Sequence, residues 1–209
     1  MLTNNTRAGV NMKKSTSGKC TGIKRPFKLE EIWRIRTRLE LENNLMQLAL
    51  LNLAIDSKLR SSDLLKTHVY DVSSQGIINA RVQCIQQKTR TDVHYEITPR
   101  TQQSLSLWIH FASLEAKNFL FPSDRRKNQP ISYSFYRSII RSWAAKLGLN
   151  ADYYGTHSMR RTKATLIYAR TKNIRAVQIL LGHSRLDNTI RYLGVELEDA
   201  LRLSEQTDC

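Results

Sequence analysis

Three stretches of this chain decide its fold: Gly-Thr-His-Ser-Met-Arg-Arg-Thr-Lys-Ala-Thr at residues 155–165, Leu-Leu-Gly-His-Ser at 180–184 and Asn-Thr-Ile-Arg-Tyr at 188–192. His157 and Arg160 are three positions apart, so a helix places their side chains on one face. The Leu-Gly pair before His183 predicts a break between two helices. Tyr192 follows nine residues after His183 and can fold back toward it.

The four side chains are the groups needed to attack a phosphodiester without a metal ion. A guanidinium offers a planar fork of donors to phosphate oxygens, and an imidazole moves a proton near neutral pH. A phenol supplies a nucleophilic oxygen once its proton has been taken. The pattern therefore predicts phosphoryl transfer with neither metal nor cofactor.

In this order, His-x-x-Arg, Leu-Gly-His and a tyrosine nine residues later resemble the catalytic signature of the tyrosine recombinases, also called the phage integrase family. The usual His-x-Leu-Arg-His/Arg-Thr-x-Ala-Thr corresponds to residues 157–165. The resemblance implies an α+β, mainly helical catalytic domain with a small antiparallel β-sheet.

Residues 57–65, Ser-Lys-Leu-Arg-Ser-Ser-Asp-Leu-Leu, resemble the first box of that family, typically Gly-Leu-Arg-x-Ser-Glu-Leu. The resemblance gives Arg60 a contact with the scissile phosphate and Asp63 a supporting role. Lys58 departs from the usual glycine, which we interpret as a change in the backbone that leaves the chemistry untouched. Without the resemblance, Arg60 would pass for an ordinary surface charge.

The family also keeps a catalytic lysine in a β-hairpin, and Lys88 stands in the turn between two predicted strands. Arg90 beside it is an alternative for that role and a candidate DNA contact. A lysine in a solvated turn with no catalytic part is the other interpretation.

The resemblance implies that Tyr192 attacks the scissile phosphate, forms a 3′-phosphotyrosine bond and frees a 5′-hydroxyl. His157 would take the proton from Tyr192, and Lys88 would protonate the departing 5′-oxygen. The nonbridging oxygens would be bound by three donors, Arg60, Arg160 and His183. The expected function is a site-specific DNA recombinase, an integrase or an invertase.

Two alternatives remain open on the sequence alone. A topoisomerase-like enzyme would nick and close one strand without pairing two sites, and a catalytically silent DNA-binding regulator would keep only the fold. The intact set of functional residues argues against the silent regulator. The resemblance further implies double-stranded DNA as partner, a homo-oligomer that is tetrameric at synapsis, and possible accessory DNA-bending proteins.

Charge is unevenly placed along the chain. The net charge is +15 and the isoelectric point is about 10.0, which favours a polyanionic partner such as nucleic acid. Residues 1–28 hold seven Lys or Arg and no acid, and residues 125–192 hold fourteen against two acids. Residues 193–209 reverse the sign, with five acids against one arginine. We expect the two basic blocks to face DNA and the acidic end to face protein.

Several classes of protein lack a signal in this sequence. Three widely spaced cysteines argue against a disulfide scaffold or a zinc ribbon, and they favour a reducing cytoplasm. There is no secretory leader, no membrane-spanning apolar run and no phosphate-binding glycine loop. We therefore expect a cytoplasmic, nucleoid-associated protein.

The chain divides into a flexible basic arm (1–28), a catalytic domain (29–192) and an acidic tail (193–209) that packs on a neighbouring protomer or on its own domain. Only about 28 residues precede the domain, so the chain resembles short, catalytic-domain-only recombinases such as those that invert fimbrial switches.

Periodicity predicts the elements inside the domain. Helices are expected from Leu29, with Trp33 in the core, and over 45–55, 99–117, 132–147, 156 onward and 174–181. Ser132 and Thr156 are expected as helix caps. Strands are expected over 68–72, 76–86 and 91–98, and a loop over 123–131. On the helix at 132–147, Phe135 is expected inside, while Arg137 and Arg141 are candidate DNA contacts or an ordinary solvated face.

Overall fold

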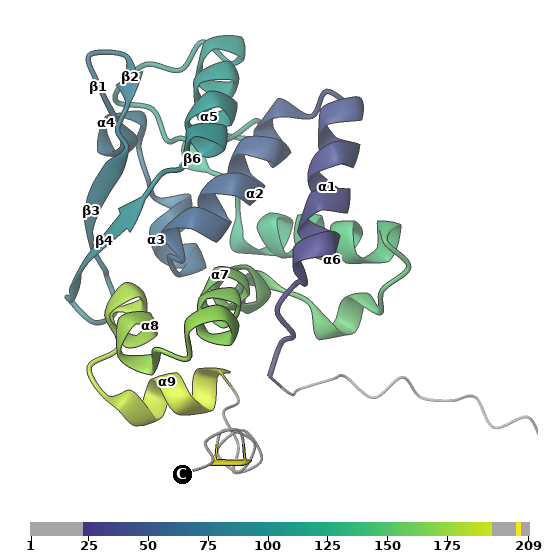
Figure 1. The fold of residues 1–209 in the computed structure, drawn as a ribbon. Helices are drawn as coiled ribbons and strands as arrows, with labels where there is room; N and C mark the ends of the chain where they lie inside the picture. Colours follow the sequence, from purple (N-terminus) through teal and green to yellow (C-terminus); the bar gives the residue numbers. More distant parts are fainter. Residues whose placement is uncertain (1–22, 194–203, 206–209) are drawn as a thin grey trace, which may run out of the picture.

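The apolar stretch that begins at Leu45 becomes α2 (Leu45–Ser57), the central helix of the fold (Figure 1). Every residue from Leu48 to Ser57 is buried, because α1 (Leu29–Leu41), α5 (Pro99–Phe111) and α7 (Thr156–Thr171) surround α2. A helix that is hydrophobic on all sides is stable only in such a setting. The sequence prediction of a buried core helix is confirmed.

The computed structural model describes residues 23–193 and 204–205. The remaining helices are α3 (Ser61–Leu65), α4 (Val69–Val72), α6 (Tyr133–Lys146), the 3-10 turn η1 (Ala151–Tyr153), α8 (Ile174–Leu181) and α9 (Leu186–Leu193). The strands are β1 (Ser73–Ser74), β2 (Ile77–Ile78), β3 (Arg81–Ile85), β4 (Asp92–Glu96), β5 (Pro122–Ser123) and β6 (Arg126–Pro130). Within these ranges, no helix is both long and apolar enough to cross a bilayer.

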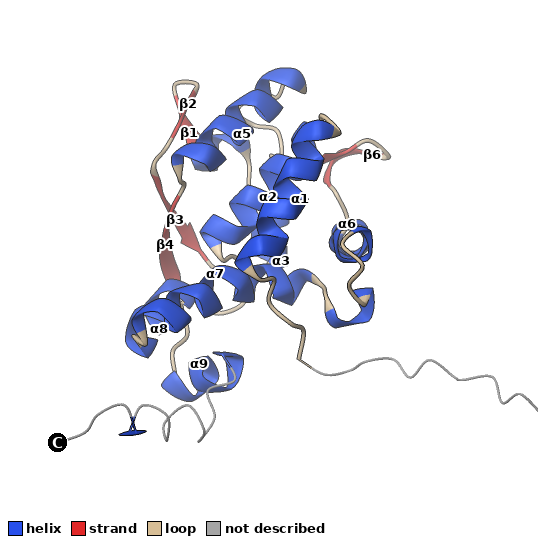
Figure 2. Cartoon of the chain, turned by 45° about the vertical axis from the view of Figure 1, so that its right-hand side comes forward, coloured by secondary structure: helices blue, strands red, loops and turns tan. Residues whose placement is uncertain are grey.

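The described strands form three antiparallel pairs, β1–β2, β3–β4 and β5–β6. The longest is β3–β4, in which Arg81 opposes Glu96 and Ile85 opposes Asp92. Strands β1 to β4 run along one side of the helical body, and β6 lies on another side (Figure 2). The mainly helical α+β class is confirmed, although the single expected sheet is divided into separate hairpins.

Four predicted elements need correction. Residues 69–72 form the short helix α4 instead of a strand, because Asp71 Oδ2 accepts a hydrogen bond from the His68 backbone N–H at 2.7 Å and closes a helical turn. The strand expected over 76–86 is interrupted after β2. Helix α5 ends at Phe111, well before residue 117, because the chain turns into a left-handed conformation at Ser113 (φ 50°). The loop expected over 123–131 contains most of the β5–β6 hairpin.

Two aromatic side chains lie differently from the prediction. Trp33 is 44% exposed, and its ring lies under the guanidinium of Arg100, with 4.5 Å from Cζ to the ring centroid. On α6, Phe135 is 48% exposed and the neighbouring Tyr136 is buried in its place. The Ser132 cap is confirmed, since its hydroxyl accepts from the Phe135 backbone N–H at 3.1 Å.

Residues 23–28, which we assigned to the arm, lie against the domain. The Phe27 ring is buried and stacks on Tyr154 at 4.5 Å between centroids, and the Phe27 backbone N–H donates to Thr162 Oγ1 at 3.0 Å. Arg161 Nη1 donates to the Lys24 carbonyl at 2.8 Å. The arm up to residue 22 and nearly all of the acidic tail lie outside the described residues.

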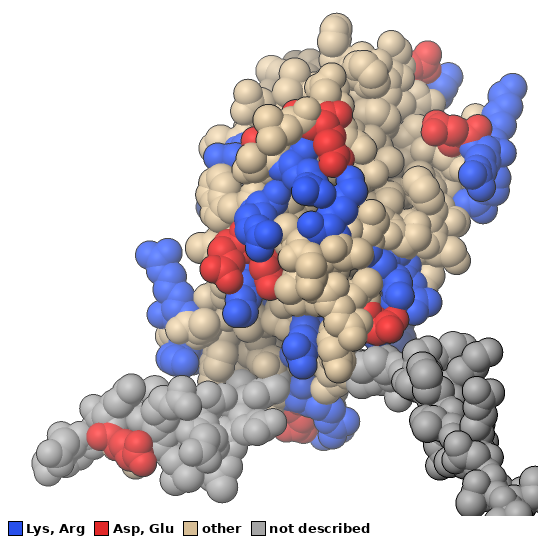
Figure 3. All heavy atoms as spheres, turned by 90° about the vertical axis from the view of Figure 1, so that its right-hand side faces the viewer, with Lys and Arg blue, Asp and Glu red and all other residues tan. Residues whose placement is uncertain are grey.

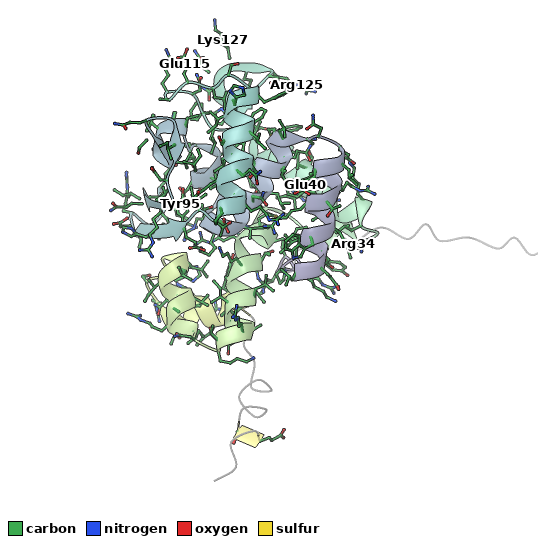
Figure 4. All side chains as sticks on the ribbon, turned by 45° about the horizontal axis from the view of Figure 1, so that its top comes forward. Arg34, Glu40, Tyr95, Glu115, Arg125 and Lys127 are labelled. Atoms are coloured by element: carbon green, nitrogen blue, oxygen red, sulfur yellow. The ribbon has the colours of Figure 1, made fainter. Side chains whose placement is uncertain are left out.

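Basic and acidic side chains alternate on part of the surface. On the face shown in Figure 3, groups of Lys and Arg atoms border Asp and Glu atoms. Two surface ion pairs are Lys146–Glu42 at 2.9 Å and Arg100–Glu40 at 3.7 Å. Such exposed pairs contribute little to stability. The basic hairpin residues Arg125 and Lys127 project at the end of the molecule away from α8 and α9 (Figure 4).

Candidate active site

Helix α7 carries His157 and Arg160 and begins differently from the prediction. Gly155 is the residue before the first turn, and its backbone N–H donates to Ser158 Oγ at 3.1 Å. Thr156 is therefore the first helical residue and not the cap. His157 is exposed, Arg160 is buried at 3% exposure, and both line one cavity of about 210 Å³.

Arg160 holds two distant segments together beneath that cavity. Its Nη1 donates to the Lys58 carbonyl at 2.7 Å, and its Nη2 donates to the Leu181 carbonyl at 2.6 Å. Burial lowers the pKa of Arg160 to about 10, so the guanidinium remains charged at neutral pH. The two carbonyls are neutral, so their hydrogen bonds do not cancel the charge of the guanidinium. The buried cation can therefore still attract an anion.

Lys58 shows why glycine is usual at its position. The residue has φ 55° and ψ 20°, the left-handed conformation that glycine adopts most easily. Its side chain is wholly buried and ion-paired with Glu96 at 3.5 Å, and burial lowers the pKa of Lys58 to about 8. Its side chain stays away from the cavity, but its carbonyl is part of the support for Arg160.

The segment after α2 brings Arg60 and Asp63 to the hairpin that bears Lys88. Arg60 precedes α3 and is half-buried, and its Nη1 donates to Gln86 Oε1. The buried Asp63 carboxylate accepts from the Gln87 backbone N–H at 3.1 Å. Asp63 thus fixes the turn residue directly before Lys88. Lys88 is exposed and lines the same cavity as Arg60, His157 and Arg160.

Gln86 joins these segments and was missed in the sequence. The side chain is buried at 1% exposure; its Oε1 accepts from Arg60 and Thr89, and its Nε2 donates to the Leu181 carbonyl at 3.2 Å. A glutamine beside a turn looks like any solvated polar residue, so the pattern gave no signal. Its role depends on the docking of α8 against β4, which is visible in Figure 1 beside the turn of the hairpin.

Gly182 ends α8 and allows this docking. Its φ is 62°, and a Cβ on this residue would lie 2.5 Å from Val93 Cγ1. Only glycine therefore lets the chain turn so close to β4 and present His183. The Leu-Gly-His motif is explained by both the backbone conformation and the contact.

The rings of His183 and Tyr192 are in contact with each other. Their rings are 5.4 Å apart between centroids and nearly perpendicular, and the Arg161 guanidinium lies 5.4 Å from the centroid of the Tyr192 ring. Burial and then the charge of Arg160 lower the pKa of His183 to about 4. The Tyr192 hydroxyl is buried, and no described group accepts or donates a hydrogen bond to it in good geometry.

Burial raises the pKa of Tyr192 well above its usual value, although Arg160, Arg161 and Arg60 act in the opposite direction. Tyr192 lines a second cavity of about 450 Å³, together with His157 and Arg161. His157 thus borders both cavities. Although His157 as a whole is exposed, part of its ring is shielded from water. This desolvation, followed by the charges of Arg160 and other nearby cations, lowers the pKa of His157, so the ring is neutral at pH 7 and free to accept a proton.

The three predicted DNA contacts lie outside the cavities. Arg90 is exposed in the hairpin turn, and Arg137 is exposed on α6. Arg141 is partly buried and pairs with Asp152 at 2.8 Å. A DNA phosphate would have to compete with that carboxylate for Arg141, so Arg90 and Arg137 are the freer cations of the three.

The arrangement suits a phosphodiester anion. Arg60, Lys88 and Arg160 surround one cavity, and Tyr192 lines the second cavity together with His157, the histidine that both cavities share. No cluster of three or more His, Cys, Asp or Glu side chains that could hold a metal ion occurs within residues 23–193 and 204–205.

A family model described as the phage integrase family matches residues 27–198. The chain belongs to this family. Integrase family membership indicates a tyrosine site-specific recombinase. The chain is 32% identical over 174 residues to "Probable integrase/recombinase YoeC" of Bacillus subtilis (strain 168). This alignment covers 83% of this chain and 90% of YoeC.

Solved structures share the integrase fold. The XerA recombinase superposes with a TM-score of 0.70 at 19% identity, covering 88% of this chain and 65% of XerA. The XerH site-specific recombinase bound to palindromic difH substrate, a post-cleavage complex, gives 0.68 at 17% identity, covering 88% of this chain and 53% of XerH. The chain thus spans nearly all of YoeC but only about half to two thirds of these two structures.

Proposed function

We propose that this integrase family protein cuts and rejoins DNA at specific sites through a 3′-phosphotyrosine bond to Tyr192. One observation carries the proposal. Arg60, Lys88, His157 and Arg160 come from three separate parts of the chain, yet they line one cavity. Cationic side chains repel one another, so their clustering around one cavity favours a site that binds an anion.

The scissile phosphate would sit in this cavity. Arg60 and Arg160 would donate to its nonbridging oxygens, where negative charge increases in the transition state, and His183 would add a third donor. Donors that the fold already holds in place require little reorganisation during the reaction. Gln86 and the two carbonyls that accept from Arg160 supply that order.

The proposed step conserves bonds and protons, and it uses three side chains. Tyr192 Oη forms a bond to phosphorus as the bond from phosphorus to the 5′-oxygen breaks. His157 accepts the phenolic proton, and Lys88 gives a proton to the departing 5′-oxygen. The bond energy remains in the phosphotyrosine link, so attack by another strand's 5′-hydroxyl reverses each transfer and rejoins DNA without ATP.

We extend the proposal to partners on the same basis. XerH, a similar structure, is bound to a DNA substrate, and a lambda integrase that is similar with a TM-score of 0.57 is a dimer on a core site. The net charge of +15 suits a DNA partner. We propose double-stranded DNA as substrate, contacts from Arg90 and Arg137, and a tetramer at synapsis, with accessory DNA-bending proteins where the site alone binds weakly.

A covalent trapping assay tests the proposal. Nicked suicide substrates, with candidate sites taken from the DNA flanking the gene, should give a protein–DNA band that survives denaturation. The band should vanish in Tyr192→Phe and persist in Tyr168→Phe, a matched control because Tyr168 lies in the same small apolar cluster. DNA binding by a well-folded protein with no adduct on any substrate would argue against strand transfer and favour a silent regulator.

A further inference from the structure

His183 is bonded to the helix that carries Tyr192. His183 Nδ1 lies 3.1 Å from Thr189 Oγ1, which is a hydrogen-bond distance. Thr189 belongs to α9 and is 0% exposed. It stands three residues before Tyr192, so both side chains project from the same side of the helix.

The burial of Thr189 decides which way this hydrogen bond runs. A hydroxyl has one proton to donate, and burying that proton without an acceptor is costly. Other threonines of the chain donate to the carbonyl four residues earlier, as Thr162 and Thr171 do, but Thr189 makes no such bond. Among the described residues, His183 Nδ1 is its acceptor. A proton on Nδ1 would instead leave the buried hydroxyl proton without a partner.

We propose that Thr189 is a positioning residue that keeps the His183 proton on Nε2, so that His183 meets the DNA phosphate as a hydrogen-bond donor. The inference rests on the function proposed above and assigns the chemical form of one of its donors. A neutral imidazole has one donor and one acceptor nitrogen, and the nitrogen bound by the protein fixes the role of the other. His183 therefore donates without carrying a charge.

The same contact joins the nucleophile to the phosphate site. The rings of Tyr192 and His183 are nearly perpendicular, with 5.4 Å between their centroids, and Thr189, on the same helix as Tyr192, is hydrogen-bonded to Nδ1 of that imidazole. Seating of α9 thus places the nucleophile and fixes the donor together. If α9 moves away, His183 loses its preferred tautomer as Tyr192 leaves the site.

The tautomer is measurable without DNA. In the full chain labelled with nitrogen-15, two-bond proton–nitrogen correlation spectra distinguish a protonated Nε2 from a protonated Nδ1 for each of the five histidines. The His183 signals are those that His183→Asn removes. We expect protonated Nε2 and bare Nδ1 in the wild type at pH 7. A predominantly protonated Nδ1 overturns the inference.

Three substitutions separate positioning from packing. Thr189→Val keeps the shape but removes the hydroxyl, and it should mix the His183 tautomers and slow covalent cleavage by about tenfold, the worth of one buried hydrogen bond. Thr189→Ser should restore both. Thr165→Val is the matched control, because the Thr165 hydroxyl is buried without a partner and its loss should change neither.

DNA affinity should stay unchanged in Thr189→Val, since the residue reaches no surface. If Thr189→Val unfolds, the wild-type tautomer and the Thr189→Ser rate still decide the matter. A Tyr192-dependent adduct formed by a protein with His183 protonated on Nδ1 refutes the inference alone. The expected tautomer in a protein that never forms an adduct refutes the proposed function alone.

Discussion

Replacing Gly182 with alanine should destabilise the protein more than the same change at any glycine in open space. The left-handed backbone (φ 62°) costs an L-residue about 1–2 kcal/mol. The new Cβ would also lie 2.5 Å from Val93 Cγ1 and 3.2 Å from Gln86 Nε2. Val93 is buried at 3% exposure, so relief of this contact requires a shift within the core, and the overpacking adds about 1–3 kcal/mol. The total loss of unfolding free energy should be about 2–5 kcal/mol.

The assay is urea unfolding, with Gly148→Ala as the matched control. Gly148 also follows a helix, has φ 77° and has no atom within 4 Å of an added Cβ, so it should lose only the backbone part. Val93→Ala removes the clashing methyl group, and it should cost less in the Gly182→Ala background than in the wild type. Equal losses for the two glycine variants, or purely additive effects with Val93→Ala, would refute the clash.

Three further predictions concern the site and its support. As the pH is lowered, the single-turnover cleavage rate should stay constant down to about pH 6.5 and fall below that, because the pKa of His157 is lowered from 6.5 and its neutral form is the base. A rate that already falls while the pH is still above 7 would contradict this. Lys163→Met should cost about 3 kcal/mol in urea unfolding, because it leaves the Asp56 carboxylate, 2.7 Å from Lys163 and 5% exposed, without its cation. Gln86→Met should slow cleavage about tenfold with unchanged DNA affinity, because Arg60 loses its acceptor; weaker binding at an unchanged rate would argue otherwise.

The sequence predicted those features that depend on local pattern. The all-apolar α2 and the Ser132 cap each follow from neighbours in the chain, and both are confirmed. The spacing of His157 and Arg160 placed them on one helix face, and both line one cavity.

The prediction failed where tertiary contacts override local preference. Phe135 and Tyr136 are adjacent aromatics, and a small rotation of α6 decides which is buried. Trp33 appeared to belong to the core by its periodicity, but Arg100, from a distant helix, covers its ring at the surface. Within the strand predicted over 68–72, residues 69–72 are helical, and the Asp71 side chain accepts a hydrogen bond from the His68 backbone N–H that caps this turn.

Support for the site was the least visible part. Gln86 gains its role only when α8 docks beside the β3–β4 hairpin, and Thr189 gains its role only when α9 packs against α7 and α8. Neither residue stands out by charge or spacing. Residues that contact the substrate are constrained in type by chemistry, whereas their supports need only a suitable polar atom in the right place. A motif therefore indicates the first group far better than the second.

Mapping the covalent bond tests the central claim most directly. After trapping on a suicide substrate, the adduct is digested with nuclease and protease, and the peptide that retains nucleotide is sequenced by mass spectrometry. The account predicts a nucleotide attached through its 3′-phosphate to Tyr192. A nucleotide on another residue, an adduct linked through a 5′-phosphate, or an adduct that survives Tyr192→Phe would contradict it.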